Sequence, residues 1–118
     1  MPSSIIWNVD ADGDWSTTSN WSPAQLPSAT DDVGIDTTDF HTVTYSAGAS
    51  TVHSLTVGND AFAITGGSLD ISAGASFSHA LGISGGSLSL AGTTTVDGVF
   101  TNTGTVSLTQ GTLELEDG

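Results

Sequence analysis

The sequence predicts an all-β protein, specifically a right-handed parallel β-solenoid (β-helix) with about three strands in each coil of 18–20 residues. Two observations lead to this fold class. Apolar residues alternate with small polar ones, and no window shows apolar residues at helical spacing. Similar segments also recur at a nearly fixed interval, with glycines between them. The handedness follows from the usual rule for connections between parallel strands.

The repeat is clearest in the second half of the chain. "ITGGSLDI" at 64–71 recurs as "ISGGSLSL" at 83–90, and "TGTVSL" at 103–108 repeats the pattern again. A β-sandwich with chance repetition is the alternative, but a near-identical octapeptide favours the solenoid. Two inward-facing ladders and one turn position should therefore align: Leu69, Leu88 and Val106; Ile71, Leu90 and Leu108; and Gly67, Gly86 and Gly104.

A shorter unit fills the rest of each period. It appears as "SLTV" at 54–57, "TTTV" at 93–96 and "TLEL" at 112–115, so short strands follow one another closely. Three such strands joined by tight turns make one coil, and the next coil stacks about 4.8 Å away. A single coil cannot bury its apolar side, so stacking must supply the core.

Residues 1–50 do not fit this repeat and are expected to form an amino-terminal capping segment, with the coils at 51–118. The segment contains all three tryptophans, all three prolines and the only tyrosine. Its expected strands lie at 5–9, 32–35 and 42–45. An aromatic-rich cap would cover the exposed strand edges and the open end of the core.

The stretch "NVDADGDWSTTSNW" at 8–21 carries the only candidate metal ligands, Asp10, Asp12 and Asp14. A helix–loop–helix calcium loop needs glycine at its sixth position and glutamate at its twelfth, where this chain has Trp15 and Trp21. A looser calcium site remains a weak alternative, because three carboxylates this close favour a cation. The preferred interpretation is a polar turn, with its aspartates in solvent, that leads into a tryptophan-anchored cap. No other cofactor is expected.

The same region resembles a known bacterial arrangement. "WNVDADGDWSTTSNWS", "LPSATDDVGI" and "HTVTYSAG" are similar to the amino-terminal part of autotransporter-like adhesin passengers and related giant secreted β-solenoid proteins. The resemblance implies an extracellular or cell-surface location. "SPAQLP" departs from the pattern, because a glycine usually stands before the proline. The matching positions are Trp7, Trp15, Asn20, Trp21, Pro27, Asp32, Val33 and Ile35.

Composition excludes several partners. The chain has no lysine or arginine and 13 acidic residues, so it cannot neutralise phosphates or anionic membrane surfaces. No apolar run is long enough to span a membrane, and "MPSSIIW" has no secretory signal pattern. We therefore expect neither nucleic-acid binding nor membrane insertion.

Catalytic groups are also not expected. Zinc would require His41, His53 and His79 to converge with a carboxylate, and surface or ladder positions are expected instead. A glycosidase would need paired carboxylates. Asp70, however, should align with Ser89 and Ser107 rather than with another acid.

Two functional classes remain. The first is a non-enzymatic structural or adhesive module of a bacterial surface or secreted protein. Such a module would self-associate end to end into filaments through its solenoid ends and would contact glycans or a host surface. The alternative is a carbohydrate-binding or carbohydrate-active β-helix domain. Because the chain reaches "TLELEDG" without a second aromatic-rich segment, we expect either further coils or stacked copies beyond the last coil.

Overall fold

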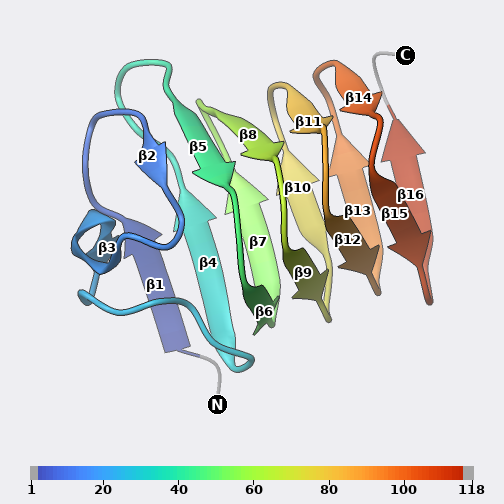
Figure 1. Cartoon of the computed structure of the whole chain (residues 1–118), viewed down its shortest axis with the longest axis horizontal. Coiled ribbons are helices and arrows are strands. Elements are labelled where there is room, and N and C mark those ends of the chain that lie inside the picture. The colour runs from blue at the N-terminus through green and yellow to red at the C-terminus, as the bar shows by residue number, and fades with distance from the viewer. Residues whose placement is uncertain (1–2, 116–118) are drawn as a thin grey trace.

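The computed structural model describes residues 3–115 and confirms the β-solenoid. The chain winds through three parallel-stranded sheets, and each coil lies beside the previous one from β1 at one end to β16 at the other (Figure 1). Four coils contribute a strand to every sheet, with about 19 residues between equivalent positions. One short 3-10 helix, η1 (Thr18–Asn20), lies near the amino-terminal end.

The first sheet has seven strands. Its order is β16-β13-β10-β7-β4-β1-β3. In chain order the strands are β1 (Ser3–Trp7), β3 (Trp21–Ser22), β4 (Asp31–Ile35), β7 (Ser54–Val57), β10 (Ala75–Phe77), β13 (Thr93–Val96) and β16 (Thr112–Leu115). Only the pairing of β1 with β3 is antiparallel.

The other two sheets have five and four strands. The five-stranded sheet contains β2 (Gly13–Asp14), β5 (Thr42–Tyr45), β8 (Ala61–Ile64), β11 (Leu81–Ile83) and β14 (Phe100–Asn102). The four-stranded sheet contains β6 (Ala49–Val52), β9 (Ser68–Ile71), β12 (Ser87–Leu90) and β15 (Thr105–Leu108).

The predicted ladders are confirmed in register. Leu88 lies opposite Leu69 and Val106, and Leu90 lies opposite Ile71 and Leu108. The members on β9 and β12 are fully buried, whereas Val106 is partly buried and Leu108 is 43% exposed. The difference arises because, within residues 3–115, no strand lies beyond β15.

Parallel pairing extends further toward the amino terminus than the repeat suggested. β4, β5 and β6 form a complete coil, and β1 and β2 pair with it from the other side. The expected boundary between residues 50 and 51 therefore falls inside β6. Only the first strand of this coil departs from the period: Val33 aligns with Leu55, an interval of 22 residues, whereas Val43 aligns with Phe62 at 19. The expected strands at 32–35 and 42–45 are present, and the one expected at 5–9 runs from Ser3 to Trp7.

The tryptophans close the amino-terminal end of the core, as predicted. Trp7, Trp15 and Trp21 are each at most 3% exposed. The Trp15 ring lies 5.0 Å from the Trp21 ring and 5.4 Å from the Tyr45 ring, both in edge-to-face geometry. The indole N–H of Trp21 also donates a hydrogen bond to the Trp15 carbonyl at 2.9 Å. These contacts join the cap to β5 of the first complete coil.

One turn explains why glycine recurs with the coils. Gly48, Gly67 and Gly86 all have positive φ, a conformation that costs other L-residues free energy. The turns also stack closely, because a Cβ on Gly67 would lie 2.5 Å from the Gly48 carbonyl oxygen. Gly104 follows them in the stack but has no positive φ. Glycine is thus required here by both conformation and space.

Candidate functional site

The three aspartates of the 8–21 stretch separate into two environments. Asp10 and Asp12 lie on either side of the His41 ring, whereas Asp14 turns toward Ser16 and Ser46. Within residues 3–115, the group of side chains close enough to share one ion is Asp10, Asp39 and His41. Potential ligands therefore gather here, but in a different set from the one the sequence suggested.

Asp14 fixes the turn that precedes Trp15. Its carboxylate accepts hydrogen bonds from the Ser16 N–H at 2.8 Å and from the Ser16 and Ser46 hydroxyls at 2.6 Å each. Partial burial is the largest single influence on the Asp14 pKa and raises it, but the hydrogen bonds together outweigh burial and leave the pKa below its usual value. Asn20 supports the same turn, because its side-chain amide donates to the Asp14 carbonyl at 3.3 Å.

His41 has a carboxylate at both ring nitrogens. Its Nε2 lies 3.1 Å from an Asp10 carboxylate oxygen, and its Nδ1 lies 3.3 Å from an Asp12 oxygen. Two backbone N–H groups hold these aspartates in place: that of Asp39 donates to Asp10 at 3.3 Å, and that of Thr42 donates to Asp12 at 2.8 Å. The imidazole thus bridges two acids from a segment about 30 residues earlier in the chain.

The loop that carries Asp39 and His41 is fastened from the next coil. Asp60 is fully buried, and its carboxylate accepts hydrogen bonds from the Thr37 N–H at 2.9 Å, the Thr37 hydroxyl at 2.7 Å and the His41 N–H at 3.0 Å. The Asn59 side-chain amide donates to the Thr37 and Thr38 carbonyls. These bonds satisfy both buried side-chain oxygens of Asp60 and set the position of the loop.

The other two histidines have simpler surroundings. His53 Nδ1 lies 2.6 Å from an Asp32 oxygen, which also accepts the Ser54 hydroxyl at 2.7 Å. The His53 hydrogen bond is the main reason that the Asp32 pKa lies below its usual value. His79 is exposed, and its ring contacts Phe40 edge-to-face at 5.4 Å. Of the three, His41 has the arrangement of a potential ligand.

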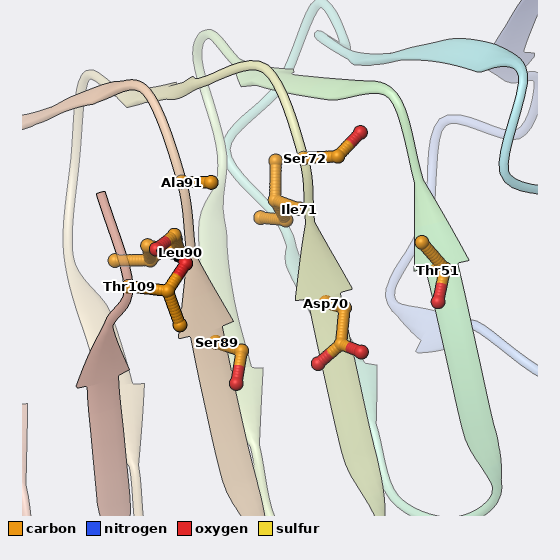
Figure 2. Close-up of a pocket in the computed structure, with 8 residues that line it drawn as sticks. All are labelled: Thr51, Asp70, Ile71, Ser72, Ser89, Leu90, Ala91 and Thr109. Atoms are coloured by element: carbon orange, nitrogen blue, oxygen red, sulfur yellow. Dashed lines mark hydrogen bonds between the residues drawn. The ribbon is translucent and has the colours of Figure 1, made fainter. Parts of the chain in front are cut away.

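A second polar feature lies on the four-stranded sheet. Thr51, Asp70 and Ser89 occupy aligned positions on β6, β9 and β12, and Ser89 aligns in turn with Ser107 on β15. This confirms the predicted alignment of Asp70 with two serines. An open groove of about 280 Å³ runs beside the row and is lined by the eight residues drawn in Figure 2, namely Thr51, Asp70, Ile71, Ser72, Ser89, Leu90, Ala91 and Thr109.

The groove offers hydrogen bonds rather than acid–base catalysis. Its lining combines four hydroxyls with one carboxylate, that of Asp70. Glycosidic hydrolysis by the usual route needs two carboxylates at a defined separation. The groove therefore has the chemistry of a weak binding surface for a hydroxyl-rich ligand.

Comparisons with family models, curated proteins and solved structures found no match to this chain. No helix within residues 3–115 is long and apolar enough to cross a membrane.

Proposed function

We propose that this chain is a non-enzymatic structural module of a bacterial surface or secreted protein, and that its solenoid ends mediate self-association. The observation that supports this proposal is the difference between the two ends of the solenoid. The amino-terminal end is closed by tryptophans, whereas β14, β15 and β16 pair on one side only within residues 3–115. We call this unpaired edge of β14, β15 and β16 the open end and the tryptophan-covered side the closed end; an unpaired parallel edge can accept another strand. The surface location rests on the resemblance to adhesin passengers.

The open edge has both polar and apolar groups available for pairing. Thr105 and Thr109 donate their N–H groups back to the previous coil, at 3.2 and 2.8 Å. Because successive residues of a strand point their N–H groups to opposite sides, those of Val106 and Leu108 face outward. Leu108 and Leu115 are also exposed large apolar residues. An edge of this kind is a template for another strand.

The geometry favours contact between two open ends. At the amino-terminal end β2 and β3 have only two residues each, and β3 runs antiparallel to its neighbour. β6, outermost in the four-stranded sheet, has four residues and pairs on one side only within residues 3–115. This end therefore offers less strand backbone to a stacking partner than β14, β15 and β16 do. Pairing of open end with open end is isologous and closes as a dimer, whereas cap-to-open-end stacking would grow into a filament.

Light scattering across protein concentration and ionic strength tests this proposal. The net charge of −13 opposes association, so salt should promote it by screening. Leu108→Pro should reduce association because it removes an outward-facing N–H, and Leu108→Ala is the matched control that keeps this N–H. Circular dichroism would establish that both variants remain folded. A strict monomer at high concentration and high salt would contradict self-association through this end.

Carbohydrate binding is the second candidate, supported by the hydroxyl-rich groove on β6, β9 and β12. Ligand sites usually include aromatic side chains, and none lines this groove, so we rank this function below the structural one. A glycan array with the native chain and an Asp70→Asn variant would test it. Binding that the substitution abolishes would favour the carbohydrate-binding function.

A further inference from the structure

We propose that Asp10, Asp39 and His41 form a binding site for a divalent transition-metal ion such as Zn²⁺, which would clip the amino-terminal segment to the loop between β4 and β5. Carboxylate oxygens of both aspartates and a ring nitrogen of His41 lie within 4.8 Å of one another. Tetrahedral zinc, with bonds of about 2.0–2.1 Å, places its ligand atoms roughly 3.4 Å apart. Both aspartates are exposed, so small side-chain rotations suffice to close the difference.

Negative charge gathers at the His41 ring, because a carboxylate oxygen lies beside each of its nitrogens. Asp10 and Asp12 provide these oxygens, and Asp39 lies close enough to Asp10 and His41 to share an ion with them. The distances of 3.1 Å at Nε2 and 3.3 Å at Nδ1 leave no room for a bridging water. A metal ion at Nε2 would satisfy that nitrogen and Asp10 together.

Asp12 would then orient the His41 ring without binding the ion. A metal-bound histidine almost always donates its other ring N–H to a carboxylate or carbonyl, which fixes the orientation of the ring. Asp12 occupies this position at Nδ1, and the Thr42 N–H holds it there. Asp39 and His41 are positioned by the bonds of Asp60 and Asn59 to the loop, so little ordering should be needed on binding.

The mixed donor set selects the class of metal. Imidazole nitrogen suits zinc, copper and nickel, whereas calcium and magnesium prefer oxygen ligands. Neither lysine nor arginine is present to compete for these carboxylates. We therefore expect Zn²⁺ to bind at a single saturable site and calcium to bind only diffusely.

Isothermal titration with Zn²⁺, at about 0.15 M salt to suppress diffuse binding, tests the proposal. Removal of a ligand in His41→Gln or Asp39→Asn should abolish saturable binding, and Asp12→Asn should weaken it about tenfold, in the range typical of outer-shell partners. His53→Gln is the matched histidine control, since His53 contacts one aspartate, and Asp70→Asn is the matched charge control. Both controls should bind zinc like the native chain.

A direct spectroscopic readout makes the result independent of any change in stability. Cobalt(II) substitution should produce a visible absorption band that His41→Gln lacks and His53→Gln retains. Zinc binding that survives His41→Gln, equal saturable binding of calcium, or no saturable binding by the native chain would each overturn the proposal.

Discussion

Leu90 and Leu108 offer a test of the open end, because they are the same residue at equivalent positions of adjacent coils. They are register partners between β12 and β15. Leu90 is 1% exposed and has a coil on each side, whereas Leu108 is 43% exposed. Truncation of each to alanine should therefore have different costs, although the strand conformation and the change in side chain are identical.

The expected costs follow from this exposure. Leucine to alanine removes three carbons, worth about 2.4 kcal/mol of transfer free energy when they are fully buried. At Leu90 a cavity between two coils adds to this, so a total of about 3–4 kcal/mol is expected, within the usual range for core Leu→Ala changes. At Leu108 roughly half of the side chain is already in water, so about 1.4 kcal/mol is lost and solvent fills the gap. The two variants should thus differ by about 2 kcal/mol.

Urea unfolding at low protein concentration would measure this difference. Circular dichroism should be recorded together with tryptophan fluorescence, because the tryptophans report on the cap and the terminal coil can unfold separately in a repeat protein. Equal costs for Leu90→Ala and Leu108→Ala at the lowest concentrations would refute the reasoning, because Leu108 would then be as fully covered in solution as Leu90. If self-association occurs, the cost at Leu108 should rise with protein concentration.

Three further outcomes are expected. Gly86→Ala should destabilise the protein by at least about 1–2 kcal/mol, because positive φ is strained for alanine and the new Cβ would meet the Gly67 carbonyl. An unchanged midpoint of urea unfolding would contradict this prediction. Trp21→Ala should lower the free energy of unfolding by about 3–5 kcal/mol and reduce the blue-shifted tryptophan emission. A variant with the stability and emission of the native chain would show that Trp21 does not pack in the cap. Asp14 and Asp32 have pKa values in the folded state that lie below their usual values. Their contribution to folding stability is therefore fully present above the pKa of an unfolded aspartate, about 3.9, and is lost as the pH falls through the lower pKa values of the folded state. The stability advantage of the native chain over an Asp14→Asn, Asp32→Asn double variant should therefore be clear at pH 7 and vanish in acid, and a constant difference across this range would contradict the linkage.

The coil region could be predicted from the sequence because one pattern determined both local structure and packing. Parallel stacking places the same phase of each coil on the same ladder, so Leu69 and Leu88 had to be neighbours once the interval was known. The cap region lacked this constraint. β4 and β7 are 22 residues apart in register, and β2 has only two residues, so neither produces a visible repeat.

The His41 cluster was missed for the same reason. His41 and Asp10 meet because β2 pairs with β5, which places residues about 30 positions apart side by side. That interval includes η1, β3 and the connection that follows, none of which obeys the coil period. Three alternating aspartates were visible in the sequence, but only the register of β2 against β5 determines which of them meet a histidine.

Because the chain has no lysine or arginine, its acidic residues must find other hydrogen-bond donors. Seven acids between positions 10 and 60 accept hydrogen bonds from backbone N–H groups or hydroxyls, and three of them also contact a histidine; the seven are Asp10, Asp12, Asp14, Asp31, Asp32, Asp36 and Asp60. Carboxylate bonds of this kind are stronger than bonds between neutral groups, and here they fasten the cap and the first complete coil. Beside β15, the hydroxyls of Thr103 and Thr109 donate instead to carbonyls of the preceding coil. The two sides of the described stack are therefore fastened by different chemistry, with carboxylates near the cap and hydroxyl-to-carbonyl bonds between the later coils.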